Sequence, residues 1–310
     1  MPSPYTLVQL RHFVVVAEVG SVTHAARRLG VTQSALSASI ARLEREFDAT
    51  LFTRSPRRGL EPTTAGRRLL HEAIPFLETA DRLYAVVHGD PDDLTGELVV
   101  GVFAPLAAFR APVILSAIEK RHPNLHVTLL EGDQEFVRRA LHEGRCELAL
   151  MYDIGLDPGL ETTVVERIPP HVVVPEGHRL ADAPDAEVSL VDLADDPLIL
   201  LDLPHTREYF FSLYRSVGAT PRVRHRASNY ETVRAFVGQG HGYAVLNQRL
   251  HHTLTYSGSR IVPLRLTDDL PPIEVLLARV PGTTPTLRAA AFAAVCRSLY
   301  GLPTGSVRSV

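Results

Sequence analysis

The sequence has little cysteine and no long hydrophobic run. Its 310 residues include two cysteines, Cys146 and Cys296, which are 150 positions apart. This spacing fits neither a disulfide framework nor a zinc motif, so we expect both thiols to be buried as small apolar groups. No apolar run approaches the roughly 18 to 20 residues of a membrane helix, and MPSPYTLVQLRHF at the N-terminus does not resemble a secretory signal. We therefore expect a globular cytoplasmic protein that does not contact the membrane.

The sequence also lacks the motifs of the common enzyme classes. It has no Gly-x-Ser-x-Gly elbow, no His-Glu-x-x-His pair and no Walker loop, so a hydrolase, a zinc protease and a nucleotide-hydrolysing enzyme have no support. The stretch GQGHG at 238–242 follows a predicted helix and precedes a predicted strand, which is the reverse of a dinucleotide-binding loop. We expect a protein that is not an enzyme and that needs no cofactor and no metal.

Positive charge is concentrated at one end of the chain. Residues 1–70 hold ten arginines and five acidic residues, so this segment carries about +5, whereas the remainder carries about −8. Neutralisation of phosphates drives binding to nucleic acids. A chance distribution of surface charge is the alternative, but the asymmetry favours a polyanionic partner for the N-terminal segment alone.

Apolar residues at helical spacing predict three short helices near the N-terminus. The first covers 8–19, the second follows a cap at Ser21 or Thr23, and the third begins after a cap at Thr32. The second and third are joined by a tight turn at a glycine. Together they predict a helix-turn-helix at about 22–41.

The stretch LFTRSPRRGLEP at 51–62 is basic and rich in turn residues, which predicts a small two-stranded wing. A long amphipathic helix should follow, able to pair with a copy of itself.

We therefore divide the chain into a winged helix-turn-helix domain at 1–64, a linker and dimerisation helix at 65–89, a hinge at 90–96 and a regulatory domain at 97–310.

Beyond residue 96 the pattern changes to short apolar runs that alternate with helices. LVVGVF, HVTLLE, LALMY, HVVVP, LILLD, YAVLN and EVLLA are predicted strands, and helices are predicted at 105–121, 134–144, 207–217, 230–239 and 285–300. This alternation is typical of α/β proteins with parallel sheets covered on both faces. We expect two Rossmann-like lobes of the periplasmic-binding-protein type, lobe I at about 97–168 and 271–303 and lobe II at about 169–270.

The N-terminal 60 residues resemble the LysR family of bacterial transcription regulators. The stretch LRHFVVVAEVGSVTHAARRLGVTQSALSASIARLEREFDATLFTRSPRRGLEPTTAG follows the family pattern almost position by position, with Ser-x-x-x-Ala-Ala, Gln-Ser-Ala-Leu-Ser, Leu-Phe-x-Arg and Thr-x-Ala-Gly. GHRLA, DLPHTREYF and GQGHGYAVLN look like features of the family's effector-binding half. The resemblance implies a homodimer through the linker helix, usually paired into a homotetramer, that binds an interrupted inverted repeat in promoter DNA. A small-molecule effector between the lobes would change DNA bending, and RNA polymerase is a candidate partner.

A recognition helix presents its first turn to base edges in the major groove, and a basic wing suits phosphates or a narrow minor groove. Gln33 can bond an adenine edge, although Gln33 and Ser34 could also serve only as helix caps. The residues expected to contact DNA are Ser21, Thr23, Thr32, Gln33, Ser34, Ser37, Arg54, Arg57, Arg58 and Thr63.

The sequence departs from the family pattern in two places. Ala38 and Ser39 stand where many members carry a long base-reading side chain, so operator specificity cannot be copied from relatives. Asp48 occupies a turn position usually held by glycine, and aspartate tolerates a left-handed backbone better than most residues.

In two-lobed α/β folds the ligand lies beyond the carboxyl ends of the strands. The candidate effector residues at such ends are Phe103, Ala104, Glu131, Asp133, Tyr152, Asp153, Asp202, His205, Ser228, Asn229 and Tyr230. We expect a small polar metabolite, with a slight preference for an organic acid that pairs with His205 or Arg207. The alternative is that each of these residues is a helix cap or a solvated turn.

Two rival functions remain at this point. A solute-binding module of the periplasmic type has the same two lobes, but it would need export and no basic helix-turn-helix. A redox sensor would need reactive cysteines, and neither Cys146 nor Cys296 has a basic setting beyond Arg145.

Overall fold

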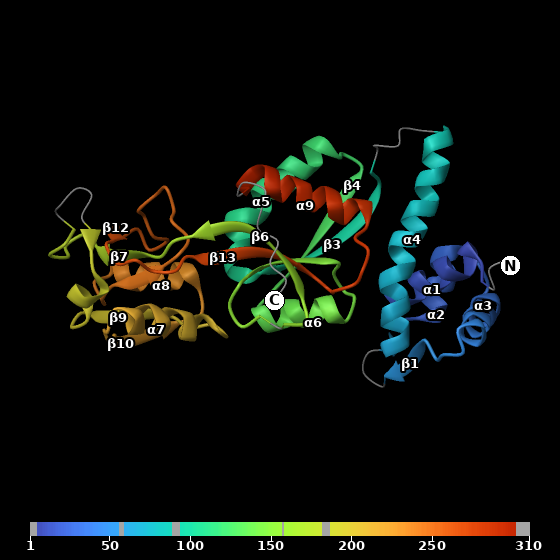
Figure 1. The fold of residues 1–310 in the computed structure, drawn as a ribbon, viewed down its shortest axis with the longest axis horizontal. Helices are drawn as coiled ribbons and strands as arrows, with labels where there is room; N and C mark the ends of the chain where they lie inside the picture. The colour runs from blue at the N-terminus through green and yellow to red at the C-terminus, as the bar shows by residue number, and fades with distance from the viewer. Residues whose placement is uncertain (1–4, 56–58, 89–93, 157, 182–186, 302–310) are drawn as a thin grey trace.

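The computed structural model describes residues 5–55, 59–88, 94–156, 158–181 and 187–301. Along its longest axis it forms three successive parts: an N-terminal head, then lobe I, then lobe II (Figure 1). The α/β architecture with a winged helix-turn-helix, a long linker helix and two lobes is the predicted one. None of the helices within the described ranges is long and apolar enough to span a membrane.

The head is a three-helix unit with a wing. Its elements are α1 (Leu7–Val19), α2 (Val22–Leu29), α3 (Gln33–Glu46) and the antiparallel strands β1 (Phe52–Ser55) and β2 (Gly59–Pro62). α1 and α2 end at Gly20 and Gly30, both with φ of 67°, where a left-handed backbone stops the helix. Asp48 has φ of 46°, so the turn after α3 keeps the left-handed conformation that was predicted for it.

Helix α4 (Thr64–His88) joins the head to the regulatory domain. Its N-terminal half contributes Leu70, Ala73 and Leu77 to the core of the head. Gly66 explains the close approach, because a Cβ at this position would lie 2.1 Å from the carbonyl oxygen of Leu51. The first turns of α4 are therefore packed as part of the head.

Lobe I is a five-stranded sheet with helices on both faces. Its elements are β3 (Gly96–Phe103), α5 (Ala104–Arg121), β4 (Leu125–Gly132), α6 (Gln134–His142), β5 (Leu148–Tyr152), β6 (Glu161–Ile168), β13 (Ile273–Arg279) and α9 (Leu287–Tyr300). The strand order is β4-β3-β5-β13-β6. In Figure 1 α5 and α9 lie on one side of this sheet and α6 on the other.

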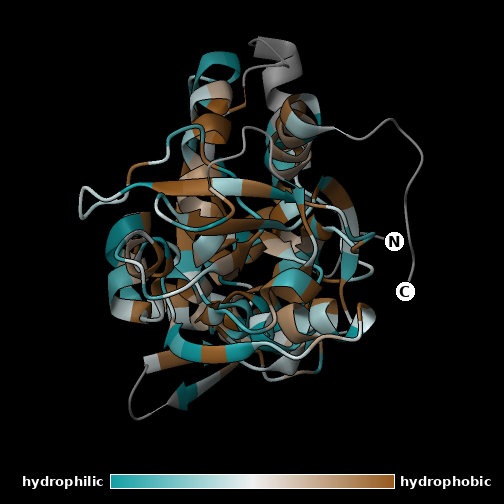
Figure 2. Ribbon diagram, turned by 90° about the vertical axis from the view of Figure 1, so that its left-hand side faces the viewer, coloured by the Kyte–Doolittle hydropathy of each residue, from teal (hydrophilic) through white to brown (hydrophobic). Residues whose placement is uncertain are grey.

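Lobe II holds β7 (His171–Pro175), β8 (Glu187–Val188), the 3₁₀ helix η1 (Leu190–Leu193), β9 (Pro197–Leu201), α7 (Thr206–Ser216), β10 (Arg222–Ala227), α8 (Tyr230–Gly238), β11 (Ala244–Leu246) and β12 (Ile261–Leu266). The sheet order is β11-β7-β12-β8, and the parallel pair β10-β9 joins it through a bridge between Leu198 and Tyr243. Figure 2 shows hydrophobic stretches along interior strands of the molecule.

The prediction of parallel sheets was wrong in part. β3 pairs in parallel with β4 and β5, but β13 is antiparallel to both β5 and β6, and β7 is antiparallel to β11 and β12. An apolar run reports burial and not strand direction, so the return of the chain from lobe II to lobe I reverses the direction without changing the composition. Strands β6, β8, β10 and β12 were not predicted.

The linker helix also contacts lobe I. The Glu78 carboxylate on α4 accepts hydrogen bonds from the backbone N–H groups of Leu287 (2.5 Å) and Arg288 (3.3 Å), which start α9. The same carboxylate lies 2.9 Å from Nε of Arg288. A carboxylate at a helix N-terminus is favourable because unpaired N–H groups converge there.

Candidate DNA-binding surface and effector pocket

The start of α3 presents short polar side chains to solvent. Thr32 is the N-cap, its hydroxyl accepts from the backbone N–H of Ala35 at 3.2 Å, and it lies 3.1 Å from the hydroxyl of Ser34. Thr32, Gln33, Ser34 and Ser37 are all exposed. The first turn of α3 is thus both capped and open to a ligand, as a major-groove reading helix requires.

Gln33 is held from the neighbouring helix. The Thr23 hydroxyl donates to Oε1 of Gln33 at 3.3 Å, which links α2 to the first residue of α3. Ser21 is half-buried and caps α2 by accepting from the N–H of His24 at 3.4 Å. This arrangement orients the Gln33 amide while its side chain stays exposed.

The wing places Arg54 on β1 with its side chain in solvent. Arg57 and Arg58 lie outside the described residues. Thr63 is half-buried, and its hydroxyl donates to the Thr50 carbonyl at 2.7 Å and accepts from the Gly66 N–H at 3.0 Å. Thr63 therefore caps α4, and both of its hydrogen-bonding capacities are used in doing so.

The head carries further exposed cations that sequence reasoning did not single out. Arg27 lies in the last turn of α2, and Arg68 lies in the first turns of α4. Both are exposed. The net positive charge of this segment indicated that it holds cations for a polyanion. The charge alone does not show which of the arginines are exposed in the fold.

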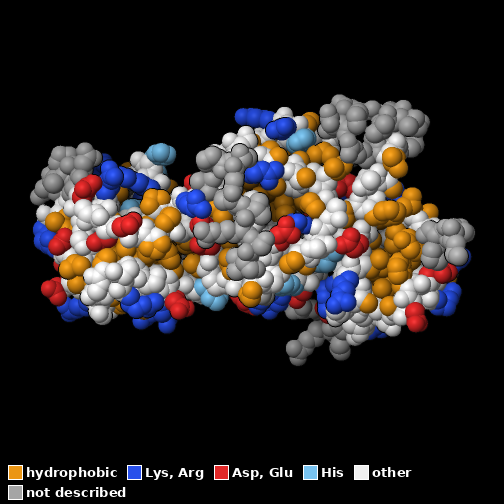
Figure 3. All heavy atoms as spheres, in the orientation of Figure 1, with side chains coloured by type: hydrophobic (Ala, Val, Ile, Leu, Met, Phe, Trp, Pro, Cys, Tyr) orange, Lys and Arg blue, Asp and Glu red, His pale blue; other side chains and the backbone are white. Residues whose placement is uncertain are grey.

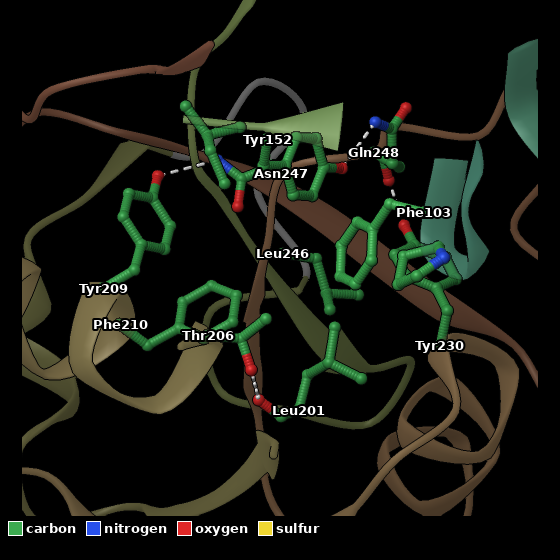
Figure 4. A pocket seen from close by; sticks show the side chains of 12 residues that line it. Phe103, Tyr152, Leu201, Thr206, Tyr209, Phe210, Tyr230, Leu246, Asn247 and Gln248 are labelled. Atoms are coloured by element: carbon green, nitrogen blue, oxygen red, sulfur yellow. Dashed lines mark hydrogen bonds between the residues drawn. The ribbon is translucent and has the colours of Figure 1, made fainter. Parts of the chain in front are cut away.

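A pocket opens between the two lobes. It is lined by Phe103, Pro105, Tyr152, Leu201, Thr206, Tyr209, Phe210, Tyr230, Leu246, Asn247, Gln248 and Ile273. Phe103 and Pro105 lie at the start of α5, Thr206 at the start of α7 and Tyr230 at the start of α8, so three helices begin at the pocket. In Figure 4 the side chains of Phe103, Tyr152, Phe210, Leu246 and Leu201 gather around its centre.

Polar side chains of the pocket bond to one another across the lobes. Gln248 Nε2 donates to the Tyr152 hydroxyl at 2.8 Å, and Asn247 Nδ2 donates to the Tyr209 hydroxyl at 2.8 Å and to the Ile168 carbonyl at 3.1 Å (Figure 4). The Thr206 hydroxyl donates to the Leu201 carbonyl at 2.9 Å. Of these bonds, Gln248 to Tyr152 and Asn247 to Ile168 join the two lobes, whereas Asn247 to Tyr209 and Thr206 to Leu201 lie within lobe II.

The pocket has little free space. Its free volume of about 20 Å³ has room for about one water molecule. Burial raises the pKa of Tyr152 to about 12 and also raises the pKa values of Tyr209 and Tyr230. The interior of the pocket therefore disfavours a negative charge.

Three of the eleven candidate effector residues, Phe103, Tyr152 and Tyr230, line this pocket. Asp133 and Asn229 cap α6 and α8, and Oδ1 of Asp153 accepts from the Glu274 N–H at 2.9 Å. Ala104 starts α5, and Glu131 and Ser228 have exposed side chains.

Asp202 and His205 lie near the start of α7 but do not line the pocket. Asp202 is paired with Arg207 at 2.7 Å and Arg226 at 3.0 Å, and these bonds hold the pKa of its carboxyl below the usual range. His205 has φ of 69°, and its ring packs on Gly155 of lobe I so closely that a Cβ there would lie 2.2 Å from Cγ.

Sequence reasoning missed Asn247, Gln248, Tyr209 and Phe210 among the lining residues. Asn247 and Gln248 directly follow strand β11, so the rule that ligands lie at carboxyl ends of strands would have included them. Tyr209 and Phe210 lie one turn inside α7. A rule that selects residues at the ends of strands does not include them.

Both cysteines are buried, as predicted. Desolvation raises the pKa of each thiol to about 12. Among the described residues no group of His, Cys, Asp and Glu side chains is arranged to hold a metal ion.

Comparisons with known proteins give a consistent result. Residues 7–67 match the family model described as bacterial regulatory helix-turn-helix protein, lysR family, and residues 91–300 match the LysR substrate binding domain. The chain is 33% identical over 250 residues to a probable hydrogen peroxide-inducible genes activator of Mycobacterium leprae, covering 78% of each chain. It is 32% identical over 247 residues to the transcriptional regulator ShiR of Corynebacterium glutamicum, covering 76% of this chain and 80% of that one. The crystal structure of HinK, a LysR family transcriptional regulator from Pseudomonas aeruginosa, is 33% identical, covers 96% of this chain and 99% of that one, and has a TM-score of 0.65.

Proposed function

The chain belongs to the LysR family of bacterial transcription regulators, and we propose that its head reads promoter DNA while the pocket between its lobes takes the effector. It is a DNA-binding transcription regulator with an effector-binding domain. The helix-turn-helix match at 7–67 leaves the solute-binding alternative without support. Because promoter DNA lies in the bacterial cytoplasm, the protein is expected to act there.

The DNA-binding assignment is carried by the exposed, capped first turn of α3, together with the exposed Arg54 of the wing. Gln33 reads a base edge, and Thr32, Ser34 and Ser37 position the helix against the backbone. Arg54, with Arg57 and Arg58, contacts phosphates. Ser21, Thr23 and Thr63 act indirectly, because they cap helices or orient Gln33.

We propose the division into a head at 1–64, a linker helix at 65–89, a hinge at 90–96 and a two-lobed regulatory domain beyond it. Support for dimerisation through the linker helix comes from exposed apolar side chains. Phe76 (52% exposed) and Leu83 (69% exposed) are seven residues apart on α4, which places them on one face, and Leu7 and Val8 are exposed on α1. Figure 3 shows hydrophobic side chains gathered over this part of the head.

A second copy that covers this surface gives a homodimer, and two dimers give the homotetramer usual in the family. A two-fold symmetric dimer implies an operator with inverted half-sites. RNA polymerase, as a possible contact of the bound tetramer, belongs to the same proposal.

The Mycobacterium leprae relative is named as an activator of peroxide-inducible genes. Peroxide sensing through cysteine requires an accessible thiol of low pKa. Here burial raises the pKa of both thiols to about 12, so we propose a bound ligand rather than thiol oxidation as the input.

The test is a selection of genomic fragments with purified full-length protein at near-physiological salt, followed by footprinting. We expect an interrupted inverted repeat. Gln33→Ala should relax preference at one half-site base by about 1 to 3 kcal/mol, whereas Arg54→Ala should weaken binding to all sequences and lower the salt slope by about 1. If Gln33→Ala instead weakens all sequences equally, Gln33 only positions the helix. Recovery of no sequence above background would contradict specific regulation.

A further inference from the structure

We propose that the pocket between the lobes selects a small uncharged molecule with a flat apolar body and a carbonyl or amide oxygen, and that it rejects the matching carboxylate. The inference rests on the proposed function, because it names the class of effector for the same pocket. It differs from the organic acid that the sequence favoured.

Aromatic and aliphatic side chains make up most of the pocket wall. Five aromatic rings come from Phe103, Tyr152, Tyr209, Phe210 and Tyr230, and Leu201, Leu246 and Ile273 fill the space between them. None of the twelve described residues that line the pocket has a charged side chain. Such a wall suits a flat apolar body and offers no ionic partner to a carboxylate. Because the free volume is about 20 Å³, the lobes must move apart to admit a ring.

Three arginines close to the pocket in sequence or space are already paired with carboxylates of the protein. Arg207 is paired with Asp202, and Arg234 is paired with Glu231 at 2.5 Å and is 2% exposed. Arg110 of lobe I binds Glu166 at 2.8 Å. An acidic ligand in this pocket would need one of these pairs to break, and breaking it would leave a carboxylate of the protein uncompensated.

The pocket does offer polar groups to a neutral acceptor. α5 and α7 both begin at the pocket without a side-chain cap, and N–H groups at such ends attract an acceptor oxygen of either charge state. Gln248 brings a side-chain amide to the same wall, and only one of its two N–H hydrogens is used by Tyr152, whereas both N–H hydrogens of Asn247 are used by Tyr209 and Ile168. A carbonyl or amide oxygen can use these donors without carrying a charge into the interior.

Desolvation decides between the neutral and the anionic ligand. The same burial that raises the pKa values of Tyr152, Tyr209 and Tyr230 also penalises a buried carboxylate. The attraction of a helix N-terminus is smaller than the cost of burying an unpaired carboxylate. The neutral member of an isosteric pair should therefore bind more tightly.

The experiment uses purified full-length protein and three matched pairs of probes at neutral pH: benzamide and benzoate, nicotinamide and nicotinate, and cyclohexanecarboxamide and cyclohexanecarboxylate. Binding is measured by calorimetry and by the shift of the melting temperature. We expect at least one amide to bind at least about tenfold more tightly than its carboxylate. Equal or tighter binding of the carboxylates overturns the proposal, as does failure of every amide to bind at about 10 mM.

A variant that adds a positive charge to the pocket gives a sharper test. Gln248→Lys brings a cation to the pocket and retains a donor for the Tyr152 hydroxyl, so it should shift preference toward the carboxylates. The control Gln239→Lys adds the same charge on the exposed end of α8 and should leave the preference unchanged. If Gln248→Lys melts far below the native chain, Ile273→Asn tests the wall instead: it should weaken amide binding without creating a carboxylate preference.

These outcomes are separate from those of the proposed function, because the probes are tested without DNA. Amide selectivity together with an unchanged footprint would support the ligand class and contradict the coupling between pocket and DNA. A specific operator without amide selectivity would support the proposed DNA-binding function and contradict the proposed ligand class.

Discussion

The proposed DNA-binding surface and the proposed effector pocket are built in opposite ways. The DNA-binding surface comes from one stretch of about 50 residues, is exposed, and is shaped by caps that reach three residues along the chain, such as the bond from Ala35 to Thr32. The pocket comes from segments between Phe103 and Ile273, has little free space, and is held by bonds such as Tyr152 to Gln248, which join residues 96 positions apart. Local chemistry can organise the first, but only the completed fold organises the second.

Solvent adds to this difference. Contacts made by exposed arginines such as Arg54 are screened by salt and are individually weak, so a DNA surface gains affinity from many of them. Groups in the pocket are desolvated, so each unpaired polar atom or charge is costly there. We therefore expect substitutions in the head to act through geometry or salt dependence, and those in lobe II to act through burial.

The largest effect is expected where the head departs from purely local order. Gly66 lies in a helix, where alanine is normally favoured by about 1 kcal/mol. Here a Cβ would lie 2.1 Å from the Leu51 carbonyl oxygen, and backbone must move to relieve the contact. We expect Gly66→Ala to destabilise the head by about 3 kcal/mol or more and to abolish DNA binding.

Urea unfolding and a DNA mobility shift measure this effect. Gly177→Ala is the matched control, because a Cβ there meets nothing within 4 Å. If Gly66→Ala instead stabilises the protein by its helix propensity, α4 does not pack on the wing as described, and the head is governed by local preferences alone.

The same contrast explains what the sequence could predict. The head was predictable because caps and glycines at fixed spacing decide it, and Asp48 could even be assigned its left-handed turn. The strand β10 was missed because its sequence RVRHRA has only two apolar residues, Val223 and Ala227, and so contains no apolar run. The pocket was recovered only where a lining residue ends a strand or begins a helix, as Tyr152 and Tyr230 do.

Tyr209 shows why the rest of the pocket could not be predicted. It packs against the cores of both lobes and bonds to Asn247, which lies 38 positions further along the chain. Nothing in the local sequence of α7 says which face meets the other lobe, because that face is set by how the lobes close. Similarly, Asp202 was a plausible ligand residue until two arginines were found to neutralise it.

Lowering the pH is expected to have an intermediate effect, which is a loss of stability in lobe II. His171 begins β7, pairs in register with the pocket residue Leu246, and is 7% exposed. Burial lowers its pKa from 6.5 to about 4, with a smaller contribution from Arg249. Between these two values the unfolded chain binds more protons than the folded chain, so stability falls as the pH falls. Lobe II should lose about 2 kcal/mol between pH 7 and pH 5.

Hydrogen exchange of the β7 amides at both pH values, corrected for intrinsic rates, reports this loss within lobe II. His171→Leu should remove most of the pH dependence, whereas His126→Leu, at an exposed position of lobe I, should leave it intact. Unchanged protection of the β7 amides between pH 7 and pH 5 would show that His171 is not desolvated. Burial would then not control the effect of a substitution in lobe II as the comparison with the head assumes.

The smallest effect is expected where the two regions meet. A groove of about 1280 Å³ separates much of the head from lobe I, so the bonds from Leu287 and Arg288 to Glu78 form a localised contact. Glu78→Gln keeps an acceptor oxygen but loses the charge that favours the helix N-terminus. We expect a loss of about 1 kcal/mol at this contact, measured as roughly fivefold faster exchange of the first N–H groups of α9.

Glu72→Gln is the control, because Glu72 is exposed on the same helix. Strand β13 begins at the pocket residue Ile273, and the chain continues from its end to the start of α9, where Glu78 binds. If Glu78→Gln alters α9 exchange and also reduces the response of DNA binding to a pocket ligand, this segment couples the two regions. If exchange changes while the response is kept, coupling does not depend on this contact.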